Sequence, residues 1–303
     1  MEDLGLQAKE VMIKFGLLRM KPVASALMLS TLVGLSGCSF APLRWPWQSS
    51  QTSNSPGALT GHGDADGKAD ASLPVLSELA DSGIKVASDE ELAACVKASG
   101  LDDEVMKLAD PTNFGTRESV DDWGRTLKAS PELIVLHETV ISEPATVNLF
   151  QTPHPRDEDQ VSYHMLIGAD GARLRIVPDQ NRAYGSGMSA FGDATQRRQP
   201  KRVGSINNVS LHVSLVTPAD GRGNTDAHSG YTNAQYRSLA AQVLLWQAQY
   251  GIPLTRVTTH AAVDRSRTRY DPRSFRWDRF DPHYQEFVQL CGFERFDNGQ
   301  AGL

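Results

Sequence analysis

The chain has 303 residues and a formal net charge of −6, and 40% of its residues are hydrophobic. This length is enough for one large or two small domains, and the apolar share is ordinary for a globular protein with a buried core. The acidic balance gives no indication of nucleic acid as a partner.

Residues 1–38 are predicted to be a lipoprotein signal peptide. Basic Arg19 and Lys21 flank the start of an apolar stretch that ends in small residues before Cys38. The alternative is a transmembrane helix, but residues 22–37 fall short of the roughly 20 residues that span a bilayer. The run L-S-G-C that ends at Cys38 resembles a bacterial lipobox, which implies cleavage before Cys38 and lipid attachment to it.

The residue after the lipobox cysteine bears on location. Ser39, and not Asp, follows the cysteine. By resemblance to bacterial lipoprotein sorting signals, this favours the outer membrane, with the chain facing the periplasm. Translation starts at either Met1 or Met20, and the sequence does not decide between them. Loss of residues 1–37 removes four basic and three acidic residues, which leaves 26 minus 33, a net charge of −7.

Residues 39–72 are predicted to be a flexible tether, because they are rich in Ser, Gly, Pro, Asp and Thr with little apolar periodicity. Residues 73–130 are predicted to be a helical N-terminal extension, with helices at 76–80 and 88–96. Two cysteines follow the lipobox, Cys95 and Cys291. They either form a disulfide or stay two separate buried thiols, since sequence gives no distance.

The main domain is predicted to span 131–293, followed by a tail at 294–303. An apolar, partly β-branched run at 133–136 indicates a buried strand that ends at His137. A helix capped by Thr232 is closed by Gly251 and Pro253. The other predicted elements are a short helix at 142–150, a hairpin over 161–178, and strands at 209–216 and 256–260.

His260 and Asp271 indicate a metal site. They stand eleven positions apart, and the polar residues between them can form a loop that lets both reach one ion. Zinc accepts imidazole nitrogen and carboxylate oxygen, and a catalytic zinc site uses three protein ligands. His137, at the end of a buried strand, is the predicted third ligand, although a lone buried histidine is more often a hydrogen-bonded core residue.

Five sequence blocks, in this order, resemble the zinc-dependent N-acetylmuramoyl-L-alanine amidases of the peptidoglycan-recognition and phage-lysozyme type. The blocks are I134-V-L-H-E-T139, V161-S-Y-H-M-L-I-G-A-D-G171, N208-V-S-L-H-V-S-L215, Y231-T-N-A-Q-Y-R-S-L239, and T259-H260 with D271-P272. The resemblance implies an α/β fold, a mixed central sheet flanked by helices with a zinc site in a surface groove. It also implies that Zn²⁺ is held by His137, His260 and Asp271, and that peptidoglycan or a muropeptide is cut between N-acetylmuramic acid and L-alanine.

The resemblance also implies a cleft lined by His164, Tyr163, Tyr184 and Ser214. The basic loop over 179–207 is a candidate groove wall for the anionic substrate, or an ordinary solvated face. His154 in the preceding loop is expected to be a solvated side chain.

The chain departs from the family at the general base. The family's glutamate aligns with Ser214. His212, Asp264 and Glu138 are the residues considered as substitutes, and His212 is the preferred one, while Glu138 is expected on the opposite strand face. Arg269 is nearest to the family's usual lysine and could stabilise an oxyanion.

Two functions of different class are therefore open. The first is a zinc amidase, and the second is a peptidoglycan-binding lipoprotein that kept the groove and lost the chemistry. Three retained metal ligands favour the enzyme. A structural zinc site normally has a fourth Cys or His ligand, and no such residue is placed for it.

Overall fold

The structure, a computed structural model, describes residues 82–200, 204–223 and 225–297. The signal peptide with Cys38, the tether and the expected helix at 76–80 lie outside these residues. Among the described residues, no helix combines the length and apolar character needed to cross a membrane.

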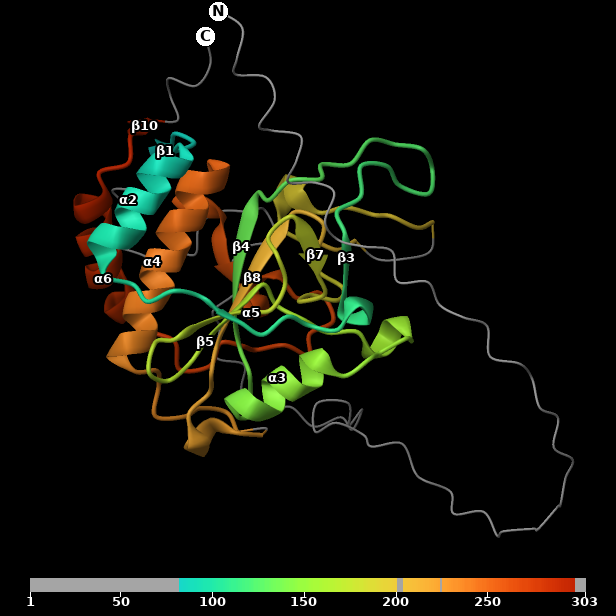
Figure 1. Ribbon diagram of the computed structural model, residues 1–303. Coiled ribbons are helices and arrows are strands. Elements are labelled where there is room, and N and C mark those ends of the chain that lie inside the picture. Colours follow the sequence, from blue (N-terminus) through green and yellow to red (C-terminus); the bar gives the residue numbers. More distant parts are fainter. Residues whose placement is uncertain (1–81, 201–203, 224, 298–303) are drawn as a thin grey trace, which may run out of the picture. The chain divides into compact units, whose positions relative to one another are not determined.

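A six-stranded mixed sheet lies at the centre of the described residues, as the sequence predicted (Figure 1). Neighbouring strands β5, β8, β4 and β9 run parallel, and β6 pairs with β5 in the antiparallel direction. The strand order is β2 (Val105–Met106), β6 (Arg173–Arg175), β5 (Met165–Ile167), β8 (Ser210–Leu215), β4 (Leu133–Glu138) and β9 (Val257–Thr259). The carboxyl ends of four parallel strands therefore share one edge of the sheet, where ligand sites of open α/β sheets are commonly found.

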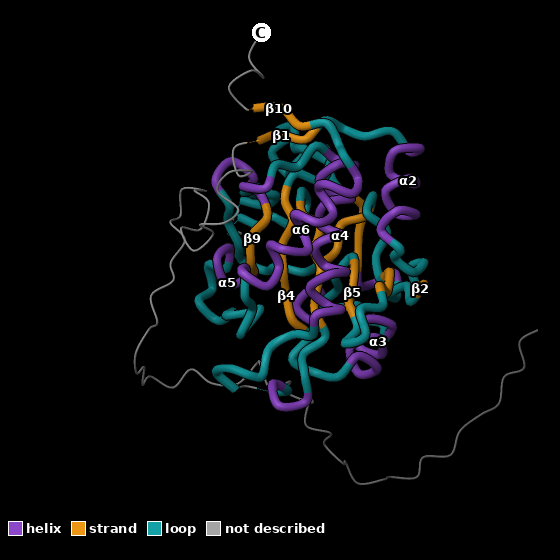
Figure 2. The backbone as a smooth tube through the Cα atoms, turned by 90° about the vertical axis from the view of Figure 1, so that its left-hand side faces the viewer, coloured by secondary structure: helices purple, strands orange, loops and turns teal. Residues whose placement is uncertain are grey.

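Helices α4 (Asn233–Tyr250) and α6 (Trp277–Cys291) cover one face of the sheet (Figure 2). Thr232 begins α4 in a capping box with Gln235, and Gly251 ends it at a φ of 68°. The apolar residues of α4 pack against Ile134 and Leu136 of β4 and against the matching positions of β5 and β8. This packing forms the main hydrophobic core.

Strand β4 is buried on both faces, and the alternation of its side chains sets the position of the site. Ile134 and Leu136 face the helices, whereas Leu133 and Val135 pack in a smaller cluster on the other face. His137 therefore shares the second face, and Glu138 shares the face of α4 and α6.

The N-terminal extension is less helical than predicted. Over residues 82–130 it contains one α-helix, α2 (Asp89–Ser99), which begins with Ser88 and Glu91 in a capping box, whereas β1 (Ser82–Ile84), β2 and β3 (Phe114–Thr116) are strands. Strand β1 pairs with β10 (Arg295–Asp297), and β3 pairs with β7 (Asn181–Ala183). Strands of two or three residues carry no readable periodicity, and distant pairing partners fix them. The described parts of the extension (82–130) and of the expected tail (294–297) thus pack together with the main domain.

The remaining elements are short. Helix α3 (Glu143–Gln151) follows β4 with Ser142 as its N-cap residue, and α5 (His260–Val263) follows β9 directly. The 3₁₀ turns are η1 (Pro111–Asn113), η2 (Asp157–Asp159), η3 (Gly192–Ala194), η4 (Ala219–Gly221) and η5 (Leu254–Arg256).

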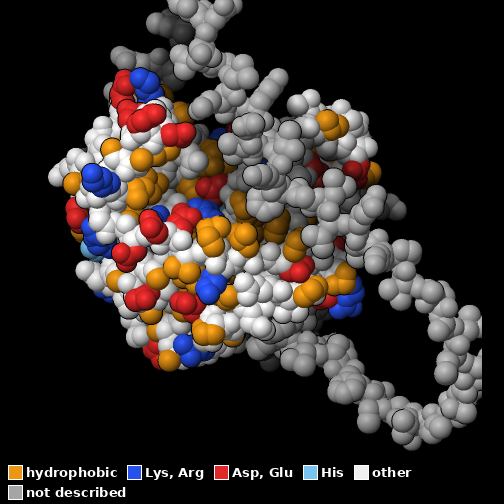
Figure 3. Space-filling view, in the orientation of Figure 1, with side chains coloured by type: hydrophobic (Ala, Val, Ile, Leu, Met, Phe, Trp, Pro, Cys, Tyr) orange, Lys and Arg blue, Asp and Glu red, His pale blue; other side chains and the backbone are white. Residues whose placement is uncertain are grey.

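Acidic and basic side chains are interspersed among the described residues on the face shown in Figure 3. Hydrophobic side chains gather around the middle of the same face. A mixed surface of this kind lacks the single-sign field that steers a highly charged polymer.

A disulfide joins Cys95 of α2 to Cys291 at the end of α6, with their Cα atoms 4.8 Å apart. The structure thus decides between the two alternatives that the sequence left open. The bridge ties the extension to the C-terminal helix across 196 residues of sequence.

Replacing both cysteines by serine is expected to lower the free energy of unfolding by about 2 to 5 kcal/mol, because a cross-link over a long loop restricts the unfolded chain. Urea unfolding of the variant, beside the parent protein with and without a reductant, measures the change. Equal midpoints in all three samples would show that the bridge does not stabilise the fold.

Candidate metal centre

Three side chains converge at the carboxyl edge of the sheet. His137 is the penultimate residue of β4, His260 begins α5 just after β9, and Asp271 lies in the loop that follows. One potential ligand atom from each lies within 4.8 Å of the others, and all three residues are buried. The structure therefore brings together the three ligands that the sequence predicted, with His260 opening a short helix and not ending a strand.

The facing atoms identify the donor set. Asp271 Oδ1 lies 3.0 Å from His260 Nδ1, and Asp271 Oδ2 lies 3.3 Å from His137 Nδ1. Within the described residues, His137 Nδ1 is buried and has no hydrogen-bond partner. Two imidazole nitrogens and one carboxylate oxygen form a donor set that suits zinc, and a buried nitrogen aimed at the other donors fits a metal ligand.

His212 contacts the other nitrogen of His137. His137 Nε2 and His212 Nδ1 lie 2.9 Å apart, and both rings are fully buried. If His137 uses Nδ1 for a metal, its proton sits on Nε2 and is donated to His212 Nδ1, so His212 carries its own proton on Nε2. No ring nitrogen of His212 is then free to accept a proton, which argues against the general-base role expected from the sequence.

His164 lies beneath the site and not in a cleft. Its Nδ1 accepts a hydrogen bond from the His212 amide at 3.0 Å, and its Nε2 lies 3.2 Å from the carbonyl oxygen of Asn181. The ring is fully buried. Because both nitrogens bond within the protein, the structure contradicts the predicted substrate contact and makes His164 a support for β8.

Tyr163 is the predicted cleft residue that borders the metal ligands. Its partly exposed ring stacks on His137 with centroids 4.4 Å apart, and it meets Phe150 of α3 edge to face. The hydroxyl of Tyr184 instead packs against β3, since a Cβ built on Gly115 would lie 2.6 Å from it. Tyr184 thus has a packing role at its polar end.

Ser214 stands opposite His137 in the register of β8 and β4. It is fully buried, and its hydroxyl has no hydrogen-bond partner among the described residues. The position where the family resemblance expects a glutamate therefore holds a small side chain that faces the same side of the sheet as His137.

Asp264 caps the loop between His260 and Asp271. Its carboxylate accepts hydrogen bonds from the amides of Ser266, Thr268 and Arg269 and from the Ser266 hydroxyl. These bonds account for its pKa, which stays low although burial alone would raise it. Asp264 thus orders the loop that carries Asp271. This use of its lone pairs argues against its predicted role as a base.

Arg269 lies beside the metal-ligand candidates, whereas two arginines of the basic segment at 179–207 are paired elsewhere. The positive charge of Arg269 acts on His137 and Tyr163, which places it beside the site as predicted. Arg182 and Arg198 instead both pair with Glu118 of the N-terminal extension. Those two arginines are therefore held by the extension, and the structure does not support them as a groove wall for anions.

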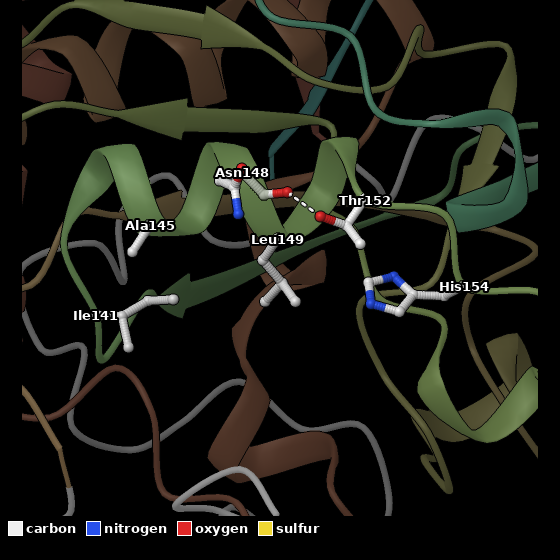
Figure 4. Close-up of a pocket in the computed structure, with 6 residues that line it drawn as sticks. All are labelled: Ile141, Ala145, Asn148, Leu149, Thr152 and His154. Atoms are coloured by element: carbon white, nitrogen blue, oxygen red, sulfur yellow. Dashed lines mark hydrogen bonds between the residues drawn. The ribbon is translucent and has the colours of Figure 1, made fainter. Parts of the chain in front are cut away.

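A separate pocket of about 220 Å³ lies beside α3 (Figure 4). Its lining is largely apolar, and it contains none of the three metal-ligand candidates. The lining residues are Ile141, Ala145, Asn148, Leu149, Thr152 and His154. The Nδ1 atom of His154 lies 2.9 Å from the side-chain oxygen of Asn113, so this loop histidine is partly ordered and not simply solvated as expected.

Burial strongly disfavours the charged form of three histidines. It lowers the pKa of His137 to about 4 and those of His164 and His212 well below the ordinary value. Asp271 stays ionised because, although burial raises its pKa, the two neighbouring histidines lower it further. His137 is thus a neutral imidazole beside an ionised carboxylate, the protonation states in which both groups bind a metal cation.

These shifts predict a steep loss of stability in acid. In the unfolded chain the three imidazoles titrate near pH 6.5, so below that pH the unfolded state binds up to three more protons than the folded state. Stability is therefore fully present above about pH 6.5 and falls as the pH drops toward about 4. With about 1.4 kcal/mol per pH unit for each proton, the expected slope is about 4 kcal/mol per pH unit.

Urea unfolding in a zinc chelator at several pH values measures this slope. His164→Gln removes one titrating group, and the slope should fall by about one third. A flat stability between about pH 7 and about pH 5 would show that these rings are not buried in the neutral form.

Sequence reasoning missed the partners of Glu138. Its carboxylate is buried and bonds with Arg273, His228 and Tyr231 on the face of α4 and α6, which confirms the expected orientation of Glu138. Arg273 stands two residues after Asp271, and this short spacing is the sequence feature that could have identified it as a neighbour of the site. No spacing in the sequence points to His228.

Comparison with known families and proteins accords with this geometry. Residues 127–274 match the family described as N-acetylmuramoyl-L-alanine amidase. The 1,6-anhydro-N-acetylmuramyl-L-alanine amidases AmpD of Citrobacter freundii and Salmonella typhimurium are each 31% identical over 121 residues, which is 40% of this chain and 56% of theirs. The chain thus spans about half the length of these curated relatives.

Among solved structures, a selenomethionine derivative of AmpD is 24% identical with a TM-score of 0.43, covering 61% of this chain and 97% of that one. AmiD from E. coli, in complex with the substrate anhydro-N-acetylmuramic acid-L-Ala-D-gamma-Glu-L-Lys, is 20% identical with a TM-score of 0.39, covering 54% of this chain and 65% of that one. Residues 127–274 therefore form a domain that matches the N-acetylmuramoyl-L-alanine amidase family.

Proposed function

We propose that this protein hydrolyses the amide bond between N-acetylmuramic acid and L-alanine in peptidoglycan or in muropeptides released from it. The convergence of His137, His260 and Asp271 in a domain of the amidase family carries the proposal. A binding module has no need of three buried donors with an open coordination position.

Zn²⁺ is the proposed cofactor, held by Nδ1 of each histidine and a carboxylate oxygen of Asp271. When bound, the ion supplies a Lewis acid that polarises a carbonyl and acidifies water. The ionised Asp271 lies between the imidazoles of His137 and His260 and gives this site a negative charge that suits a divalent cation.

The surrounding residues would orient the ligands and the substrate. His212 holds His137 in the tautomer that leaves Nδ1 free, because the two rings face each other at 2.9 Å. Tyr163 packs on the same imidazole and presents a partly exposed aromatic surface to the substrate. Arg269 places a positive charge beside the reacting carbonyl, where it would stabilise a developing oxyanion without exchanging a proton.

A second candidate function is a peptidoglycan-binding protein of low activity. Ser214 favours it, because the buried position beside His137 offers no carboxylate. Since general acid–base catalysis is typically worth about 10² to 10⁴ in rate, an enzyme without this group would be slow.

One experiment separates the two candidates. Residues 39–303 are incubated with purified peptidoglycan and, in parallel, with soluble anhydro-muropeptides, each with and without a zinc chelator, and products are identified by mass spectrometry. Chelator-sensitive release of peptides with a free L-alanine amino terminus supports the amidase. Binding without new ends, in both substrates, supports the binding protein.

We also propose that the protein is lipid-anchored at Cys38 and faces the periplasm, on the outer membrane more than the inner. The disulfide between Cys95 and Cys291 supports this, since such bridges persist in oxidising compartments. Membrane fractionation of cells that express the protein, or Cys38→Ala, tests it. Recovery of both proteins in the soluble fraction would refute the anchor.

A further inference from the structure

Glu138 is a buried carboxylate directly after a candidate metal ligand, but on the other face of the sheet. Its Oε1 accepts hydrogen bonds from the Arg273 amide at 3.1 Å and from Arg273 Nε at 2.5 Å. Its Oε2 accepts from His228 at 3.1 Å and from Tyr231 and Thr217 at 3.2 Å each. Both oxygens are thus fully used inside the protein.

Arg273 extends the same network to the loop after β8. Its terminal nitrogens donate to the carbonyl oxygens of Gly221, Gly223 and Thr225 and to the Thr225 hydroxyl. The side chains of Arg273 and Glu138 are 2% and 0% exposed. A buried pair of this kind is costly to break, because removal of one partner leaves the other charge without compensation.

The pair links the two segments that carry metal-ligand candidates. Glu138 follows His137 in β4, and Arg273 follows Asp271 by two residues. The Asp271 carbonyl in turn accepts a hydrogen bond from the Ala261 amide at 2.9 Å, next to His260. The Glu138–Arg273 pair therefore connects the strand of His137 to the loop of Asp271 through contacts that do not involve the metal-ligand candidates themselves.

We propose that Glu138 and Arg273 are positioning residues that hold Asp271 at ligand distance from His137 and so set the affinity for zinc. The inference rests on the proposed metal site and adds residues that do not touch the ion. Partners that orient metal ligands are typically worth about 10- to 100-fold in metal affinity. The pair acts on backbone position, because its contacts reach the Arg273 amide as well as its side chain.

Glu138→Gln keeps the size of the side chain and removes its charge, and Arg273→Lys keeps the charge and removes the forked contacts. Zinc dissociation constants of the full chain are measured by competition with a chromophoric chelator, at a temperature where circular dichroism shows each protein folded. Both variants are expected to bind zinc about 10- to 100-fold more weakly than the parent. The control is Cys95→Ser/Cys291→Ser, which destabilises the fold at a distance and should leave the zinc affinity unchanged.

The outcomes are distinct. Failure of the parent protein to bind zinc would refute the proposed metal site itself. Parent-like affinity in either folded variant would overturn the positioning role, as would an equal loss in the cysteine control. If Glu138→Gln does not fold, Arg273→Lys decides alone, and a loss confined to Glu138→Gln would mean that charge and not position matters.

Discussion

Replacement of His260 by alanine is expected to abolish zinc binding and amide cleavage together. His260 supplies one of three converging donors, and its Nδ1 lies 3.0 Å from Asp271 Oδ1. Two donors do not make a stable catalytic zinc site. A metal ion contributes several kcal/mol of transition-state stabilisation, so the rate should fall on the order of 10³-fold or more.

Two measurements check this result. Elemental mass spectrometry gives the zinc content of the protein, and an assay for new L-alanine amino termini gives the cleavage. His283→Ala is a suitable control, because His283 lies on α6, outside the metal-ligand cluster. A His260→Ala protein that lacks zinc and still cleaves peptidoglycan would contradict the proposed mechanism.

The second large effect is a gain. Ser214→Glu is expected to raise turnover by about 10² or more, because it places a carboxylate beside His137, at the position where the family resemblance expects one. Ser214 is fully buried with an unpartnered hydroxyl, so the new carboxylate faces the metal centre and not solvent. Some loss of stability is expected, since burial of a carboxylate is costly without a partner.

Ser214→Gln is the matched control for this gain. It has the same size and cannot exchange a proton, so the difference in turnover between the two variants isolates proton transfer. Turnover measured over a range of pH should show a new ionisation in the Glu variant alone. Equal turnover in the Glu and Gln variants would show that proton transfer at this position does not limit the reaction.

Much of the site was open to prediction because its signals are local. A buried strand that delivers His137 near its end and a helix bounded by Thr232 and Gly251 both follow from short-range patterns. The structure confirms them, with the strand one residue longer than expected. The metal set followed from the spacing of His260 and Asp271 together with the family resemblance. Strand alternation also placed Glu138 on the face opposite to His137 correctly.

Roles that depend on contacts between distant segments were not predictable. His212 and Asp264 are polar and near the metal ligands in sequence or on the sheet, but their lone pairs are used by His137 and by the loop after Asp264. Likewise, the pairing of Arg182 with Glu118 joins segments 64 residues apart. A sequence shows which polar groups are present, but it does not show which partners form hydrogen bonds with them.

The sequence by itself determined the resemblance to an amidase family, because that resemblance depends on short blocks of residues in a fixed order, and the resemblance implied the mixed α/β class and the three metal-ligand candidates. Only the tertiary structure decided that Cys95 and Cys291 are bonded, that strand β2 of the extension joins the central sheet, and that Glu138 and Arg273 form a buried pair. The physical reason is that hydrogen bonds and burial are pairwise and non-local, and they exist only when the chain brings both partners together.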